Sequence, residues 1–393
     1  MTEEILKLKV ERIKWETPDT ATFYLSSIEG NFIPYTAGQF ITLIFNHRQE
    51  EIRRSYSLSS SPDEQYLAIT IKRITNGEIS RFMLTKIKEG DELTALAPAG
   101  RFIINDHQQE KDLFLFAGGS GITPIFSQLK YILSREGKSR LTLIYSNQSA
   151  ASILFKNELD KLAAEHPERL TIIYLLSSEG NRLNPDKVEK LVKQYTSFNL
   201  GDAEFYLCGP FAFMRMIRFD LVYMGIDQAK IRRENFVLET VAVTSSFTNF
   251  PPKNIKIKYR GELHDIVVGE NQSILQAALQ NNIPLPYSCR GGICSTCMVK
   301  CTGGKVEMVK NDVLTEADLA QGWILTCTGH PLDDEVVVGP PSPLKRGSYT
   351  GKRKNNQCIK KINGRLANAA LPSFYAPPIL PFLIWIFCVC RAR

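Results

Sequence analysis

The sequence predicts a multidomain chain of the α+β and α/β classes, because three stretches with different patterns follow one another along its 393 residues. The first hundred residues alternate apolar and polar positions in short runs, which is typical of antiparallel strands. An uninterrupted apolar run then leads into a glycine-rich turn and a helical pattern, as in a doubly wound α/β domain. The third stretch carries a closely spaced set of cysteines.

In the first stretch, turn signals separate four alternating runs. The runs are residues 6–10, 22–25, 40–45 and 67–72. They predict an antiparallel barrel or sandwich. Within it, Arg54, Tyr56 and Ser57 offer a cation for a phosphate, a ring for stacking and a hydroxyl for a ring nitrogen. The three residues suit a flavin, although such a motif on its own is more often an exposed strand face.

Two further features of the first stretch strengthen the flavin interpretation. Gly77-Glu-Ile-Ser80 precedes a helical run over residues 80–87, and the N-terminus of that helix would favour a pyrophosphate. Pro98-Ala-Gly100-Arg-Phe102 then leads out of the barrel.

The second stretch opens with the apolar run of residues 112–117, which predicts a buried parallel strand. It continues into Gly118-Gly119-Ser-Gly121-Ile-Thr123-Pro124 and a helix to about residue 135. We expect Thr123 to be the N-cap and Pro124 the first helical residue. A glycine turn that feeds a helix N-terminus is a nucleotide phosphate site.

Later strands of this domain are expected at residues 141–145, 170–176 and 204–208, with helices between them. The last strand ends at Cys208-Gly209-Pro210. It ends at the carboxyl edge of the sheet, where doubly wound folds bind their ligands.

The cysteines of the third stretch are the most specific signal in the chain. Cys289, Cys294 and Cys297 follow the pattern C-x4-C-x2-C, and Cys327 lies thirty residues further on. This is the plant-type [2Fe–2S] spacing. Zinc sites usually pair two C-x2-C knuckles, and a disulfide is disfavoured in a chain without a secretory signal. The spacing therefore predicts four cluster ligands, with Cys301 as a small buried residue instead.

The cysteine loop must wrap around a cluster, and Gly291 and Gly292 supply the backbone freedom and N–H groups for it. A helix is predicted over residues 274–279 with Ser273 as its cap, and a short strand around residues 323–329. Residues 254–338 resemble a plant-type ferredoxin domain, which has a β-grasp fold.

The order of these parts resembles the ferredoxin–NADP reductase superfamily with a C-terminal ferredoxin domain, over residues 4–340. The reductase subunits of phenylacetyl-CoA epoxygenases (multicomponent di-iron monooxygenases) resemble it most, and reductases of ketosteroid and other Rieske-type hydroxylases share its domain order. The resemblance implies a Greek-key FAD barrel over residues 1–108 and an NAD(P) domain over 109–236. It also implies a linker over 237–252 and a ferredoxin domain over 253–340.

The resemblance also implies residue roles. Arg54 binds the flavin phosphate, Tyr56 lies against the isoalloxazine, and Ser57 lies near its N5 atom. The remaining implied contacts are Gly77 and Ser80 at the FAD pyrophosphate, Gly119, Gly121, Thr123 and Pro124 at the nucleotide, Cys208, Gly209 and Pro210 beside the nicotinamide, and Phe236 near the flavin. Ser57 and Cys208 are thus expected nearest the reacting atoms, and the pyrophosphate contacts favour FAD over FMN.

The sequence departs from the family pattern at one position that bears on the choice between NADH and NADPH. Gln148 stands where many NADPH-using relatives are expected to have an arginine, and Arg182 could serve a 2′-phosphate instead. NADPH is slightly favoured, and NADH remains open.

These parts predict an enzyme that takes electrons from NAD(P)H through FAD and the cluster to an external acceptor. The expected acceptor is the oxygenase component of a phenylacetyl-CoA epoxygenase type, with a Rieske-type hydroxylase or a desaturase as the alternative. A cluster-based redox sensor is the alternative from another class. A sensor needs no nicotinamide site, so the motifs around Gly121 and Cys208 count against it. The linker is expected to let the ferredoxin domain move.

Charge argues against a nucleic-acid or membrane partner. The net charge is +7, but residues 341–393 hold ten Lys and Arg and no Asp or Glu. Without that tail the chain carries −3, and a cytoplasmic, mildly acidic electron-transfer body is expected. Acidic residues expected near the cluster include Glu307, Asp312, Glu316 and Asp318, which would either steer a basic partner or form a solvated face. Residues 341–393 are expected to be a non-native extension, and a weak membrane anchor is the alternative.

Overall fold

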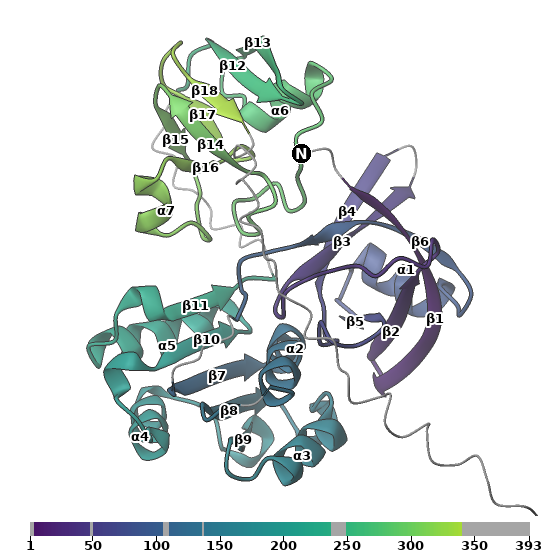
Figure 1. Cartoon of the computed structure of the whole chain (residues 1–393), viewed down its shortest axis with the longest axis vertical. Coiled ribbons are helices and arrows are strands. Elements are labelled where there is room, and N and C mark those ends of the chain that lie inside the picture. The colour runs from purple at the N-terminus through teal and green to yellow at the C-terminus, as the bar shows by residue number, and fades with distance from the viewer. Residues whose placement is uncertain (1–3, 48–49, 105–109, 136, 237–248, 340–393) are drawn as a thin grey trace, which may run out of the picture. The chain divides into compact units, whose positions relative to one another are not determined.

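The computed structural model describes residues 4–47, 50–104, 110–135, 137–236 and 249–339. Their strands form a six-stranded, two five-stranded and a two-stranded sheet (Figure 1). Most of the expected linker, residues 237–248, and the tail from residue 340 onward lie outside the described residues. Within the described residues, no helix is long and apolar enough to cross a membrane.

The first sheet is antiparallel and has the strand order β4-β3-β6-β1-β2-β5. Its strands are β1 (Ile5–Thr17), β2 (Thr20–Ser27), β3 (Phe40–His47), β4 (Glu50–Ser57), β5 (Leu67–Lys72) and β6 (Glu92–Ala99). Its two edges meet through a bridge between Leu58 and Ile69, which closes the sheet into a barrel. The interior of this barrel is filled mainly by aliphatic side chains. Helix α1 (Glu78–Lys86) connects β5 to β6.

The second sheet is entirely parallel, in the order β11-β10-β7-β8-β9. Its strands are β7 (Asp112–Gly118), β8 (Arg140–Asn147), β9 (Leu170–Leu176), β10 (Glu204–Cys208) and β11 (Ile231–Glu234), and its helices are α2 (Ile122–Leu133), α3 (Lys156–Glu165), α4 (Pro185–Tyr195) and α5 (Phe211–Tyr223). Helices α2 and α3 contribute to one core and α4 and α5 to the other. The chain runs outward from β7 to β9 and then returns to β10, so the topological switch point lies between β7 and β10.

The third sheet is mixed, in the order β13-β12-β18-β14-β16. Its strands are β12 (Lys253–Tyr259), β13 (Glu262–Val268), β14 (Met298–Gly303), β16 (Trp323–Leu325) and β18 (Val337–Gly339). Strands β15 (Val306–Met308) and β17 (Gly329–Pro331) form the small sheet, and the helices are α6 (Ile274–Gln280) and α7 (Glu316–Ala320). A hairpin, a packed helix and a central parallel pair give the expected β-grasp arrangement.

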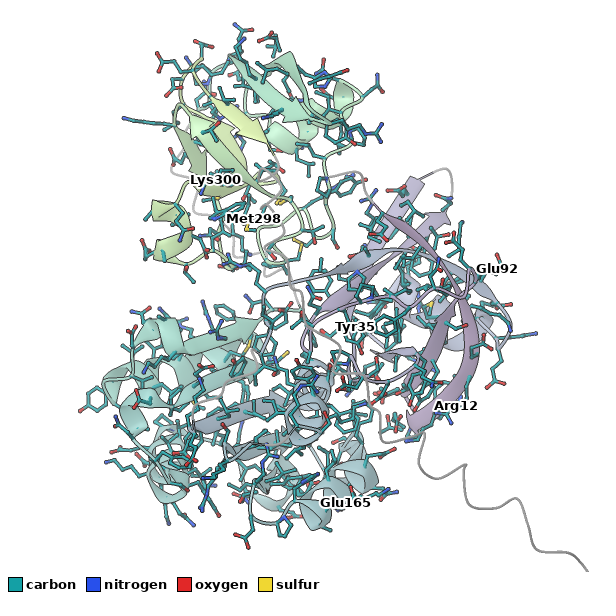
Figure 2. All side chains as sticks on the ribbon, viewed as in Figure 1. Arg12, Tyr35, Glu92, Glu165, Met298 and Lys300 are labelled. Atoms are coloured by element: carbon teal, nitrogen blue, oxygen red, sulfur yellow. The ribbon has the colours of Figure 1, made fainter. Side chains whose placement is uncertain are left out.

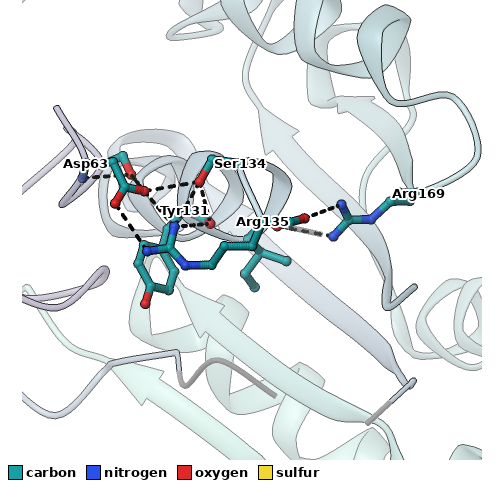
Figure 3. Close-up of polar contacts among 7 residues, drawn as sticks. Asp63, Tyr131, Ser134, Arg135 and Arg169 are labelled. Atoms are coloured by element: carbon teal, nitrogen blue, oxygen red, sulfur yellow. Dashed lines mark hydrogen bonds and ion pairs between the residues drawn. The ribbon is translucent and has the colours of Figure 1, made fainter. Parts of the chain in front are cut away.

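The barrel and the α/β part are joined by polar contacts to helix α2. Asp63, in the segment between β4 and β5, receives two hydrogen bonds from Arg135, at 2.6 and 3.2 Å (Figure 3). The guanidinium also lies 3.6 Å from the centre of the Tyr131 ring. Arg169 donates to the carbonyls of Ile132 and Arg135, which places a cation at the C-terminus of α2. Paired and stacked in this way, Arg135 holds the end of α2 to the barrel.

Replacing Asp63 by Asn tests this contact. The hydrogen bond from Arg135 lowers the pKa of Asp63. The stabilisation is therefore complete above the unfolded-state pKa of about 4 and is lost as the pH falls through the lower folded-state value. Because the pair is partly exposed, Asp63→Asn should reduce the free energy of unfolding by about 0.5–1 kcal/mol at pH 7. The difference from wild type should shrink in acid.

Chemical denaturation at neutral and acid pH measures this effect. Glu168→Gln, which removes one exposed negative charge from the α/β part, is the control. Equal stability of wild type and Asp63→Asn at pH 7 would show that the contact contributes nothing.

Candidate redox sites

The four predicted cluster cysteines are brought together in the third domain. Cys289 contacts Cys294 and Cys327, and Cys297 also contacts Cys327. Contacts with Cys294 and Cys327 lower the pKa of Cys289, whereas contact with Cys289 raises the pKa of both partners. One thiolate is thus stabilised by neighbouring thiols, and bound iron would deprotonate all four.

The loop that carries these cysteines uses unusual backbone conformations. Arg290, Gly292 and Ser295 have φ angles of 51°, 76° and 55°. A Cβ on Gly292 would lie 2.6 Å from the carbonyl oxygen of Lys310, so glycine is required there. The N–H of Gly291 donates to the sulfur of Cys289 at 3.4 Å, a contact that would offset negative charge on a cluster. Gly292 therefore supplies the expected backbone freedom, and Gly291 the expected N–H group.

This donor set fits a [2Fe–2S] cluster, which is held by four cysteine thiolates. Cys289 contacts Cys294 and Cys327, and Cys297 contacts Cys327, so the four thiols form one connected group. Cys297 directly precedes β14, whose first residue, Met298, is labelled in Figure 2. Cys301 lies outside this group, and its half-buried thiol contacts the carbonyl of Gly303 at 3.2 Å. Cys301 thus packs against the core and is half-buried, less than the buried position expected from the sequence.

The flavin motif lies on strand β4. Pairing with β3 sets Arg54 opposite Leu43 and Tyr56 opposite Ile41, which places both on one face of the strand. Ser57 follows directly after Tyr56 and therefore starts on the other face, where it is buried. Arg54 and Tyr56 therefore share a face of β4, and Ser57 does not. Burial raises the pKa of Tyr56 to about 12, so the phenol stays neutral.

The predicted pyrophosphate turn is tightly built. Helix α1 starts at Glu78, two residues before the predicted start, and it has no side-chain cap at Gly77. A Cβ on Gly77 would lie 2.6 Å from the Ser80 hydroxyl. That hydroxyl accepts from the N–H of Ile74 at 3.2 Å and donates to the Gly77 carbonyl at 3.4 Å. Ser80 therefore shapes the turn, and a helix that begins without a side-chain cap fits an anionic ligand.

The glycine loop after β7 differs from the prediction in one detail. Gly119–Gly121 form a 3-10 turn, and α2 begins at Ile122 with Gly121 as its N-cap. Thr123 is therefore inside the helix, where its hydroxyl donates to the carbonyl of Ser120 at 3.1 Å. The expected N-cap role of Thr123 was wrong, because the preceding turn starts the helix earlier. Pro124 lies in the first turn, where its missing N–H costs nothing.

Cys208, Gly209 and Pro210 pack directly against this loop. A Cβ on Gly121 would lie 2.1 Å from the Cys208 carbonyl oxygen, and one on Gly118 would lie 2.8 Å from Pro210. The carboxyl ends of β7 and β10 therefore meet at the switch point, where doubly wound folds bind nucleotides. Burial raises the pKa of the Cys208 thiol well above its ordinary value, so it stays protonated.

Two residues at these strand ends were missed from the sequence. The hydroxyl of the buried Tyr145 donates to the Gly119 carbonyl at 3.1 Å and accepts from the Leu154 N–H at 3.2 Å, which supports the glycine loop. Glu234 ends β11 beside Cys208. Burial raises the pKa of Glu234 to about 8, and the nearby Cys289 adds to the rise. The Tyr145-Ser-Asn motif could have indicated the role of Tyr145. The position of Glu234 follows only from the parallel pairing of β10 and β11.

The other residues predicted from the sequence are exposed or take part in ion pairs. Phe236 is 43% exposed just beyond β11, and Gln148 and Arg182 are exposed after β8 and β9. Of the acidic residues, Asp318 is buried and accepts from Arg101 at 2.6 Å, and Asp312 lies 3.4 Å from Lys310. Asp318 thus stabilises a contact, and does not present a free charge to a partner.

These sites together define an oxidoreductase with flavin, nicotinamide and ferredoxin domains. Models of the oxidoreductase FAD-binding domain, the oxidoreductase NAD-binding domain and the 2Fe-2S iron-sulfur cluster binding domain match residues 7–104, 115–218 and 257–332. The chain is 32% identical over 343 residues to a component of the 1,2-phenylacetyl-CoA epoxidase of Escherichia coli, covering 84% of this chain and 96% of the relative. It is 32% identical over 352 residues to a ferredoxin reductase component of 3-ketosteroid-9-alpha-monooxygenase from Mycobacterium tuberculosis, covering 86% and 96%.

The chain therefore belongs to the ferredoxin–NADP reductase superfamily with a C-terminal [2Fe–2S] ferredoxin domain, as the motifs predicted, and it is of the type that serves as reductase component in multicomponent oxygenases. Its fold matches phthalate dioxygenase reductase with a TM-score of 0.55 at 23% identity, over 85% of this chain and 98% of that one.

The close approach of Gly121 to Cys208 gives a direct prediction. Gly121→Ala places a methyl group 2.1 Å from a carbonyl oxygen, so the strand ends must separate. We expect kcat/KM for NAD(P)H-driven ferricyanide reduction to fall by about tenfold or more, equal to a loss of about 1.4 kcal/mol.

Gly137→Ala is the matched control, because its Cβ would meet nothing closer than 3.7 Å. Steady-state kinetics at equal flavin content compares the two variants. Wild-type kcat/KM in Gly121→Ala would mean that this contact does not shape the nucleotide site.

Proposed function

We propose that the chain is an NAD(P)H-dependent reductase that delivers single electrons to an oxygenase component. FAD, when bound, accepts two electrons as a hydride and releases them singly, and a [2Fe–2S] cluster carries one at a time. The main support for the proposal is the cluster of four thiols formed by Cys289, Cys294, Cys297 and Cys327. The same chain also has closely packed strand ends at Gly121 and Cys208, where doubly wound folds bind nucleotides.

The proposed roles of the chain's own residues are those that the resemblance implies. Arg54 would bind the flavin phosphate, Tyr56 would pack on the flavin ring, and Ser57 would serve the reacting nitrogen. The first turn of α1, after Gly77, and Ser80 would hold the FAD pyrophosphate. The remaining roles are the nucleotide loop of Gly119, Gly121, Thr123 and Pro124, the nicotinamide contact of Cys208, Gly209 and Pro210, and the aromatic cover of Phe236. No proton needs to move through a side chain in hydride transfer, so a buried, protonated Cys208 suits a packing role.

The proposed domain limits lie at residues 108, 236 and 252. The proposed site of action is the cytoplasm. The exposed Arg182, after β9, supports a slight preference for NADPH, since a 2′-phosphate needs a cation.

The proposed acceptor is a di-iron oxygenase of the phenylacetyl-CoA epoxygenase type. The similarity to the 1,2-phenylacetyl-CoA epoxidase component over 84% of the chain supports it. A Rieske-type hydroxylase is the second candidate, supported by the equal identity to the 3-ketosteroid-9-alpha-monooxygenase reductase component.

The test uses purified protein that contains flavin and cluster, with NADPH and NADH in parallel. We expect rapid cytochrome c reduction that is lost in Cys297→Ser, while ferricyanide reduction through the flavin persists in that variant. Cys301→Ser, whose thiol lies outside the cluster group, is the control and should keep both activities. No NAD(P)H-driven cytochrome c reduction by the replete protein would reject the proposal. Added oxygenase components of the two types then show which one accepts the electrons.

A further inference from the structure

We propose that Arg53 and Ser55 are positioning residues that hold the first cluster ligand against the flavin-binding strand, and so set the rate at which electrons pass from flavin to cluster. The inference deepens the proposed function and rests on its order of electron carriers. It arises from strand β4, because alternate residues of one strand point to opposite faces. Arg54 and Tyr56 occupy the face of the flavin motif, and Arg53 and Ser55 occupy the other face.

Arg53 holds the residue two places before Cys289. Its guanidinium donates to the carbonyl of Tyr287 at 3.0 Å and lies 3.9 Å from the centre of the Tyr287 ring. Glu51 completes the contact by accepting from Arg53 at 2.7 Å and from the Tyr287 hydroxyl at 3.2 Å. The Arg53 side chain is only 7% exposed, so its charge is held by these partners and not by water.

Ser55 holds the residue directly before Cys289. The hydroxyls of Ser55 and Ser288 lie 2.6 Å apart, and Ser55 also lies 2.9 Å from the hydroxyl of Thr42 on β3. Ser288 is buried in this contact. Three consecutive residues are thus fixed in order, Tyr287 by Arg53, Ser288 by Ser55, and Cys289 by its covalent bond to Ser288.

The geometry explains how β4 can set the relation between the first cluster ligand and the flavin motif. Tyr56, on the flavin face, is the next residue after Ser55, which contacts the segment that leads into Cys289. A shift of that segment therefore moves a cluster ligand relative to the flavin motif. Arg101 makes a second set of contacts, at 2.6 Å to Asp318 on helix α7 and at 3.8 Å to the sulfur of Met298, which follows Cys297. These contacts lie outside residues 287–289.

The expected effect is selective. Arg53→Gln removes the ion pair and the stack, and leaves the Tyr287 carbonyl and Glu51 without their cation. Ser55→Ala removes the hydroxyl contact to Ser288. Neither change touches Arg54 or Tyr56, so flavin binding and hydride transfer should be retained, while the docked arrangement of residues 287–289 is weakened.

Single-turnover reduction of the holoprotein by NAD(P)H separates the steps, because flavin and cluster bleach at different wavelengths. We expect flavin reduction at the wild-type rate and cluster reduction slowed by about tenfold in Arg53→Gln, which equals about 1.4 kcal/mol, with a smaller slowing in Ser55→Ala. Hydrogen exchange of the amides of residues 287–289, measured without turnover, should become faster in both variants.

Arg12→Gln is the matched control, because Arg12 also stacks on a tyrosine, Tyr24, at 3.8 Å, but within the barrel. It should change neither cluster reduction nor exchange at residues 287–289. Wild-type cluster reduction in Arg53→Gln and Ser55→Ala would overturn the inference, as would equal slowing of flavin and cluster reduction. Failure of NAD(P)H to reduce the cluster in wild-type protein would instead reject the proposed function, and the exchange measurement would still report on the docking contact.

Discussion

The arrangement of the redox sites depends on the close packing of two strand ends. The carbonyl oxygen of Cys208 occupies the space in front of Gly121, and Gly118 and Gly209 meet with their backbones in contact. Side chains at these glycines would force β7 and β10 apart and widen the crevice at the switch point. Because β11 pairs with β10, the same packing places Glu234 beside Cys208, at the end of the sheet that comes near Cys289.

The barrel contributes a second constraint through the two faces of β4. One face presents Arg54 and Tyr56, and the other binds Tyr287 and Ser288 through Arg53 and Ser55. Because side chains alternate between the two faces of a strand, β4 contributes both to the flavin motif and to the contact with the cysteine loop. Helix α2 links this barrel to the nucleotide loop, since its first turn follows Gly121 and its last turn is joined to Asp63. The three domains are therefore connected by elements that are themselves parts of the sites.

The sequence predicted the elements whose signals are local. The strands around residues 112–117, 170–176 and 204–208 and the Ser273-capped helix are present, because continuous apolar runs and a capping box determine them over few residues. The cysteine spacing predicted the cluster group for the same reason. The face of Ser57 was not predicted, since it depends on pairing with β3. Tyr145, Glu234 and the Arg53–Tyr287 contact were not predicted either, because they join residues that are distant in the sequence. The contact of Asp318 with Arg101 likewise could not be predicted from the distribution of charged residues in the sequence.

An anaerobic reductive titration tests the central claim, that a single chain holds both a flavin and a cluster in electronic communication with the nicotinamide site. Protein replete in FAD and iron is titrated with NAD(P)H while the flavin and cluster absorption bands are followed. We expect uptake of three electrons per chain, two by the flavin and one by the cluster, with both bands bleaching. Uptake of only two electrons, with the cluster band unchanged, would contradict it.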